Sequence, residues 1–132
     1  MMLEWNDYRK QLAAGVKQVG QLSPDTVKGY IALSSAGGKK NLLGAKVREL
    51  ISLAVAVTLR CDGCITVHTE AALRHGATEE EIAEALGVAV AINAGAALVY
   101  STRVLDAVRT YPNAADPPAT PRGLPTADAR QT

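Results

Sequence analysis

Apolar residues recur along most of the chain at the spacing of a helix face. Between residues 6 and 21 they fall three or four positions apart, while lysine and glutamine occupy the other side. This pattern predicts an amphipathic helix over 6–21. Its apolar face consists of Tyr8, Leu12, Val16 and Val19.

The tripeptide Ser23-Pro24-Asp25 carries the signals of a second helix start. Serine is a common residue before a helix, and proline suits its first position. An acidic side chain in the first turn interacts favourably with the helix dipole. We expect this helix to end at the glycine pair Gly37-Gly38. Four residues share its expected inner face: Val27, Tyr30, Ile31 and Ser34.

The pattern then predicts a central helix over 45–59, because the stretch "LISLAVAVTL" is apolar on nearly every side. A fourth helix is expected from Cys61 to Gly76. Thr78 and Glu81 have capping-box spacing and predict the start of a fifth. We expect a kink or break at 93–95, followed by a last helix over 96–109.

The composition supports an all-helical fold. The 132 residues include one Trp, no Phe and many alanines, and alanine is the strongest helix former. We therefore predict an all-α, single-domain helical bundle of about six helices over residues 1–110. The remaining residues, 111–132, are rich in proline and poor in large apolar side chains, which predicts a disordered or extended tail.

Charge and hydropathy narrow the expected partners. The net charge is only +1 and no basic stripe is interleaved with aromatics, so we expect no nucleic-acid partner. The longest apolar run, 85–100, is shorter than the roughly 20 residues of a membrane span, which favours a buried helix and no membrane partner. The first residues do not resemble a signal peptide, and we expect a cytoplasmic protein.

The stretch "RCDGCITVH" carries the candidate chemistry. If a helix starts at Cys61, then Cys64 and His68 follow on the same face, one and two turns later. The first turn of a helix stabilises a thiolate, and a second thiol nearby can close a disulfide with little loss of loop entropy. His68 can exchange protons near neutral pH. This arrangement favours redox catalysis over the two alternatives below.

Those alternatives are a metal site and inert packed thiols. Cys61, Cys64 and His68 supply three zinc ligands, with Glu49 or a water as a fourth, yet no second Cys/His pair exists in the sequence. Buried free cysteine also often serves as a small apolar residue. His75 precedes Gly76 and is interpreted as a helix C-terminal residue without a catalytic role.

These residues resemble a known family. Glu49, eleven intervening residues, Cys61, two residues, Cys64, three residues and His68 reproduce the E-x11-C-x2-C-x3-H pattern of the alkylhydroperoxidase D-like proteins. Those proteins belong to the carboxymuconolactone decarboxylase superfamily. The stretches "LGAKVRELISLAVAV" and "GATEEEIAEAL" also look similar to that superfamily, and the resemblance covers roughly residues 20–109.

The resemblance implies a thiol-dependent hydroperoxide reductase that uses no cofactor and no metal. Cys61 and Cys64 would cycle between dithiol and disulfide, while Glu49 and His68 relay protons. In the family the second cysteine, here Cys64, is generally assigned the attack on peroxide, whereas the position of Cys61 at the helix start favours Cys61 as the more acidic thiol.

The resemblance also implies the partners. These are a small hydroperoxide or disulfide substrate, a lipoyl-bearing or thioredoxin-like protein reductant, and further copies of the chain in a homohexamer, with a trimer as the alternative. The competing functions are a carboxymuconolactone decarboxylase-like lyase, whose known members typically lack the cysteine pair, and a non-enzymatic redox-sensing or zinc-binding module.

Overall fold

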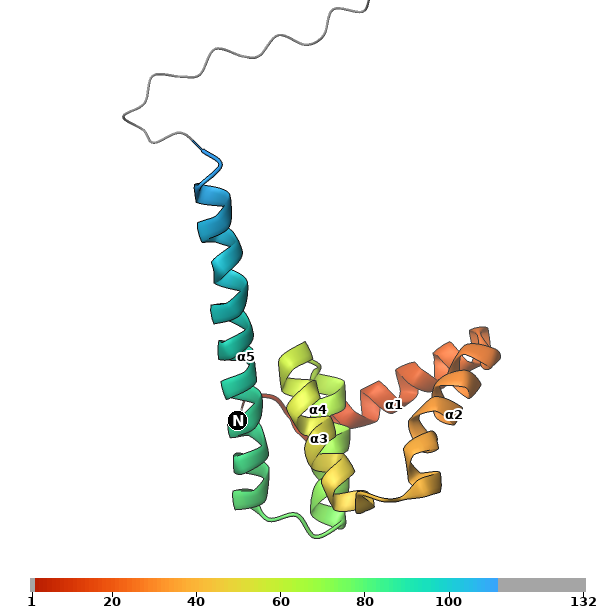
Figure 1. Ribbon diagram of the computed structural model, residues 1–132. Helices are drawn as coiled ribbons and strands as arrows, with labels where there is room; N and C mark the ends of the chain where they lie inside the picture. Colours follow the sequence, from red (N-terminus) through yellow and green to blue (C-terminus); the bar gives the residue numbers. More distant parts are fainter. Residues whose placement is uncertain (1, 112–132) are drawn as a thin grey trace, which may run out of the picture. The chain divides into compact units, whose positions relative to one another are not determined.

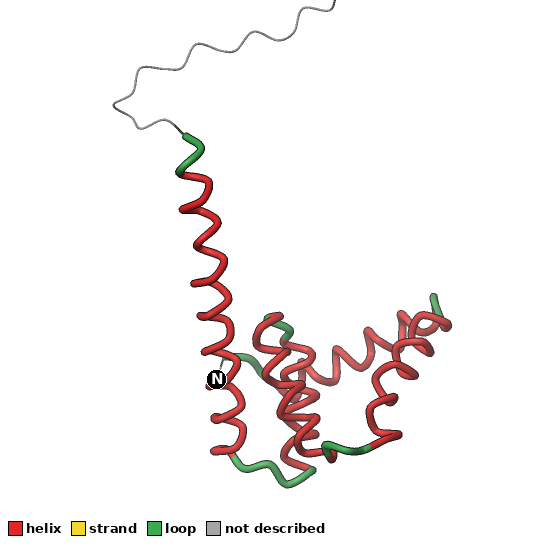
Figure 2. The backbone as a smooth tube through the Cα atoms, in the orientation of Figure 1, coloured by secondary structure: helices red, strands yellow, loops and turns green. Residues whose placement is uncertain are grey.

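The computed structural model describes residues 2–111 and is all-helical over that range. Five helices are present: α1 (Trp5–Leu22), α2 (Pro24–Lys40), α3 (Gly44–Leu59), α4 (Asp62–Arg74) and α5 (Glu79–Val108) (Figure 1). Loops connect them without any strand in this part of the chain (Figure 2). The predicted all-α class is confirmed, but the helix count is five rather than six.

The chain divides after Ala94 into two compact units, and each is described by itself. The first contains α1 to α4 and the first half of α5. The described part of the second, residues 95–111, is the second half of α5 and the residues that follow it. The predicted proline-rich tail lies outside the described residues beyond Tyr111, so the division between a 1–110 domain and a tail stays a prediction.

The predicted start of α2 is confirmed, although its cap differs in detail. Ser23 precedes the helix and Pro24 is its first residue. The Ser23 hydroxyl pairs with the Thr26 hydroxyl at 2.8 Å and makes no capping bond to a backbone N–H. The position of the helix start therefore depends on the proline more than on the serine side chain.

The predicted end of α2 at Gly37 and Gly38 is wrong, because the helix continues to Lys40 and ends at Asn41 with φ of 53°. A glycine costs a helix only about 1 kcal/mol relative to alanine, which neighbouring turns can offset. The bare surface of the glycines is used by Arg48, whose Cδ would lie 3.5 Å from a Cβ on Gly37. Arg48 Nη1 also donates to Asn41 Oδ1 at 2.7 Å, which fixes the turn.

The buried core lies where α3 packs along α4. Leu53 is 3 % exposed and Ala72 is fully buried, and Ala77 completes the cluster. Leu50 and Ile82 pack against it. The prediction that the third helix is central holds for this face only, since the opposite face of α3 is open in the single chain. Four apolar residues lie on that open face: Val47, Ile51, Val55 and Leu59.

The start of α5 confirms the predicted capping box. The Glu81 N–H donates to Thr78 Oγ1 at 3.2 Å, and the Thr78 N–H donates to Glu81 Oε2 at 3.0 Å. Lys46 of α3 donates to Glu81 Oε1 at 2.7 Å. The Lys46 hydrogen bond, followed by the one from the Thr78 N–H, lowers the pKa of the Glu81 carboxyl below its ordinary value.

The predicted break at 93–95 is wrong, because α5 runs unbroken through this segment. The Asn93 side chain satisfies its amide within the helix by donating to the Ala89 carbonyl at 2.7 Å, and it also donates to Thr58 Oγ1 at 2.8 Å. The single Gly95 costs about 1 kcal/mol, which an alanine-rich helix tolerates. Asn93 and Gly95 thus interrupt the apolar sequence pattern without ending the helix.

The expectation that the long apolar run is buried is also wrong for the single chain. Ala89 is the buried residue of α5, whereas large side chains such as Leu98 are 74 % exposed. Among the described helices, α5 is long and apolar enough to cross a membrane by length and composition, a test that core helices of soluble proteins also pass. The expected inner face of α2 is open as well, with Tyr30 and Ile31 both more than half exposed.

Candidate active site

The two candidate cysteines begin at the junction of α3 and α4. α3 ends with Arg60 in the left-handed conformation, at φ of 53°. The Cys61 N–H then donates to the Ala56 carbonyl at 3.0 Å, and the Arg60 N–H donates to the Val57 carbonyl at 3.2 Å. This pair of bonds is the Schellman motif, which normally places glycine where Arg60 stands. The backbone of Cys61 is therefore fixed by the helix that precedes it.

The side chain of Cys61 is fixed by the helix that follows. Cys61 is the N-cap of α4, and its Sγ accepts a hydrogen bond from the Cys64 N–H at 3.2 Å. Cys61 and Cys64 form a disulfide with a Cα–Cα distance of 5.3 Å. Unpaired N–H groups and the helix dipole favour negative charge at this end of the helix. In general, such groups at the start of a helix favour the thiolate form of a cysteine.

The other two candidates, Glu49 and His68, meet between α3 and α4, which lie side by side in Figure 1. His68 Nδ1 and Glu49 Oε2 are 2.6 Å apart. Both side chains are partly buried, at 30 % and 20 % exposed. With Glu49 ionised, Nδ1 carries the hydrogen and Nε2 is left with its lone pair, so the carboxylate selects the tautomer that can accept a proton.

The structure thus joins the four predicted residues as two pairs on neighbouring turns. Cys64 and His68 are four residues apart on α4 and share a face. No hydrogen bond between residues 2 and 111 links the cysteine pair directly to the Glu49–His68 pair. Within the same range, no three His, Cys, Asp or Glu side chains gather in a way that could hold a metal ion.

The structure adds a contact that the sequence interpretation missed. A Cβ placed on Gly63, between the two cysteines, would lie 3.0 Å from Leu12 Cδ2 of α1. Leu12 was assigned to the apolar face of its helix but not to the cysteine stretch. Gly63 is the residue in the sequence that could have indicated this contact, because the lack of a side chain permits close approach of another helix.

His75 lies where the sequence predicted, at the end of α4. It is the C-cap residue, and its N–H donates to the Ala71 and Ala72 carbonyls. Gly76 follows in the left-handed conformation, with φ of 82°. The backbone of His75 thus closes the helix.

Comparison with known proteins agrees with this architecture. The family model described as "Carboxymuconolactone decarboxylase family" matches residues 24–107. An uncharacterised protein of Haemophilus influenzae is 45 % identical over 107 residues, which are 81 % of this chain and 95 % of that protein. An uncharacterised protein of Cupriavidus necator is 36 % identical over 87 residues, 66 % of this chain and 77 % of that one.

A solved structure gives the same result. The crystal structure of an apo carboxymuconolactone decarboxylase family protein from Legionella pneumophila superposes with a TM-score of 0.65 at 31 % sequence identity. The match covers 81 % of this chain and 96 % of that one. The fold and the sequence therefore point to one family.

Proposed function

Because the chain belongs to the carboxymuconolactone decarboxylase family, we propose that it is a hydroperoxide reductase of the alkylhydroperoxidase D type. Cys61 and Cys64 would alternate between dithiol and disulfide. The observation that carries this proposal is the cysteine pair at the start of α4 together with His68, one turn beyond Cys64, which lies 2.6 Å from Glu49 of α3. It combines a closable dithiol with a proton carrier.

The proposed reaction balances without a further reactant in its oxidative half. One thiolate attacks the terminal peroxide oxygen, the O–O bond breaks, and the alkoxide leaves as an alcohol after taking a proton. The attacking sulfur becomes a sulfenic acid. The second thiol attacks that sulfur, water leaves, and the disulfide forms. Two thiols and one hydroperoxide thus give one disulfide, one alcohol and one water.

In this scheme the cysteine pair carries out the redox steps, and the Glu49–His68 pair moves the protons. His68, oriented by Glu49, donates protons to the leaving oxygen and takes them from the thiol that attacks second. Replacing His68 by Asn should slow disulfide formation by about 10²-fold to 10⁴-fold. Glu49→Gln keeps a hydrogen-bonding group but loses the charge, so a smaller loss is expected. Unchanged rates in both variants would remove the relay from the mechanism.

The order of attack is tested by single-cysteine variants. Capping by the Cys64 N–H favours Cys61 as the thiolate, whereas the family resemblance assigns the attack to Cys64. After one equivalent of cumene hydroperoxide, the variant that keeps the attacking cysteine should accumulate sulfenic acid, detected with dimedone and mass spectrometry. The variant that keeps the other cysteine should stay reduced. Peroxide reduction by Cys64→Ser at the wild-type rate would contradict the dithiol cycle.

The primary test is a thiol count on fully reduced protein. Adding one equivalent of cumene hydroperoxide should remove both thiols and yield an intramolecular Cys61–Cys64 disulfide by mass analysis. Two intact thiols would overturn the proposal. Turnover of a carboxymuconolactone by a variant lacking both cysteines would instead support the lyase that gives the family its name.

Turnover requires a reductant, for which we propose a lipoyl-bearing or thioredoxin-like protein in the cytoplasm. Reduction of the disulfide transfers two electrons and two protons, and small dithiols such as dihydrolipoamide supply both. The assay is the rate of disulfide reduction by dihydrolipoamide and by thioredoxin. If neither reduces the disulfide, this choice of donor is wrong.

We also propose that the chain works as a homohexamer, or as a trimer. In residues 2–111 no large side chain is fully buried, and open apolar surface occurs on α2, α3 and α5. Surface of this kind on a soluble protein marks association sites. Sedimentation velocity should give a species of three or six chains. A stable monomer at micromolar concentration would contradict the assembly.

A further inference from the structure

A cleft separate from the thiol pair lies between α1 and α4. Its volume is about 340 Å³. Trp5 of α1 and Ile65 and Leu73 of α4 supply its apolar walls. A dry cavity of about 150 Å³ is enough to hold benzene, so this cleft accommodates a single ring with a short substituent.

Two threonines give the cleft hydrogen-bonding capacity. Thr66 is only 6 % exposed and lines the cleft together with Thr69. Within residues 2–111 no side-chain hydrogen bond engages the Thr66 hydroxyl. Both hydroxyl groups can donate a hydrogen bond to a molecule in the cleft or accept one from it.

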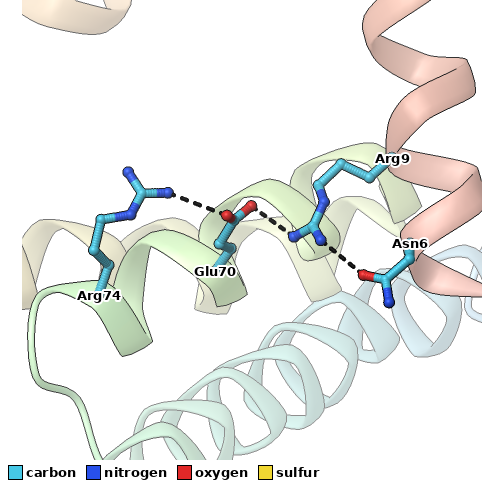
Figure 3. A network of polar contacts seen from close by, with 4 residues as sticks. All are labelled: Asn6, Arg9, Glu70 and Arg74. Carbon is cyan, nitrogen blue, oxygen red and sulfur yellow. Dashed lines mark hydrogen bonds and ion pairs between the residues drawn. The ribbon is translucent and has the colours of Figure 1, made fainter.

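Two residues that line the cleft, Arg9 and Glu70, belong to the network of polar contacts drawn in Figure 3. Arg9 Nη1 of α1 donates to Glu70 Oε2 at 2.6 Å, and Arg9 Nη2 donates to Asn6 Oδ1 at 2.8 Å. Arg74 pairs with the other oxygen of Glu70 at 3.5 Å. The network holds two guanidinium groups and one carboxylate, so it keeps one uncompensated positive charge. Residues 2–111 engage two of the five Arg9 N–H donors, and the other three make no hydrogen bond within that range.

We propose that this cleft binds small carboxylates with an apolar body, such as an arylacetate. The ring would lie against Trp5 and Leu73, and the carboxylate would take the free donors of Arg9. A planar guanidinium binds a carboxylate with two parallel hydrogen bonds, which selects an acid over a neutral or cationic analogue. This site uses none of the thiol chemistry and does not depend on the proposed peroxidase activity.

The test uses the chain's own reporter. Trp5 is the single tryptophan of the 132 residues, so its fluorescence reports occupancy of the cleft directly. The full-length protein is titrated with phenylacetate and with phenylacetamide, which has similar shape but no charge. Phenylacetate should bind at least about tenfold more tightly, because hydrogen bonds to a charged group contribute more than neutral ones. Equilibrium dialysis with labelled phenylacetate gives the affinity independently of any optical change.

Two variants of the charged network have opposite expected effects. Arg9→Gln should bring phenylacetate binding down to the level of the amide. Glu70→Gln should strengthen it several-fold, because the competing carboxylate is gone. Lys10→Gln is the matched control: it removes one positive charge from α1 outside the cleft and should leave affinity unchanged.

Equal binding of phenylacetate and phenylacetamide would overturn the proposal, as would unchanged affinity in Arg9→Gln with a native circular dichroism spectrum. No binding of phenylacetate by dialysis would overturn it too. Cys64→Ser should bind phenylacetate like the wild type. The two proposals can therefore fail separately: a negative result in the peroxide assay does not affect the test of the cleft, and absence of phenylacetate binding does not affect the peroxide assay.

Discussion

The α3–α4 hairpin and α5 contrast in how their apolar residues are used. In the hairpin, Leu53 and Ala72 are buried against each other's helix, and hydrogen bonds fix both helix ends. In α5, a longer and more apolar helix, most large side chains are open to solvent in the single chain. One face of the hairpin is thus buried by contacts among the described residues, whereas most large side chains of α5 are left uncovered by those residues.

This difference teaches where the chemistry can be placed. All four candidate catalytic residues lie on the hairpin, where short-range bonds determine their positions. An apolar surface such as that of α5 gains stability mainly from association, since burial of apolar area is the main driving force. Four predictions test this contrast.

The largest expected effect is in the hairpin core. Leu53→Ala should lower the free energy of unfolding by about 2–5 kcal/mol, because it leaves a cavity between α3 and α4. Leu98→Ala on α5 should cost less than about 0.5 kcal/mol when the chain is dilute. Urea denaturation at several protein concentrations measures both. A growing cost of Leu98→Ala with concentration would indicate that a second chain covers α5, whereas equal costs in dilute solution would break the comparison.

The next effect concerns the left-handed residue at the end of α3. Arg60→Val should destabilise by about 1–2 kcal/mol, because a β-branched residue adopts a positive φ only with strain. Arg60→Gly is the matched control and should be neutral or slightly stabilising, within about 0.5 kcal/mol. Thermal unfolding of the oxidised and reduced proteins measures the change. If Val and Gly are equally stable at this position, the Schellman motif does not hold the junction.

A smaller effect is expected at the start of α5. Thr78→Ala removes a cap that satisfies the Glu81 N–H and should cost about 1 kcal/mol. Ser23→Ala, at the start of α2, should cost less than about 0.5 kcal/mol, because that hydroxyl pairs with the Thr26 hydroxyl and makes no capping bond to a backbone N–H. Denaturation of the two variants in parallel gives the difference. Equal costs would mean that the reciprocal bonds of the capping box add nothing.

The smallest effect is a pH dependence. The Lys46 hydrogen bond lowers the pKa of Glu81 in the folded state, so the contact stabilises the protein above the ordinary value of 4.5. That contribution is lost as the pH falls through the lowered pKa. Glu81→Gln should therefore flatten the acid end of the stability curve measured by thermal unfolding. A Glu81→Gln curve parallel to the wild type would exclude this linkage.

The helix positions that were predicted correctly have strong local signals. Pro24 marks the start of α2, Gly76 the end of α4, and Thr78 with Glu81 the start of α5. In each case the residue that ends or begins the helix acts within one turn, so a short stretch of sequence contains the whole interaction. The spacing that places Cys64 and His68 on one face of α4 is equally local.

The wrong predictions required information from distant residues. Gly37 and Gly38 lie within a helix, and Arg48 of α3, about ten residues further along the chain, packs beside them. Asn93 continues α5 while it bonds to Thr58, 35 residues away. The cleft was not predicted at all, since Arg9 and Glu70 are 61 residues apart and meet only when α1 packs on α4.

The double role of Cys61 has a consequence for protein engineering. Its N–H completes the end of α3 and its sulfur caps the start of α4, and every bond that does this comes from residues 56–64. Residues 56–64 therefore supply by themselves the hydrogen bonds that hold a dithiol at the junction of two helices. Grafted into the turn of an unrelated antiparallel helical hairpin, it should deliver the same cysteine geometry.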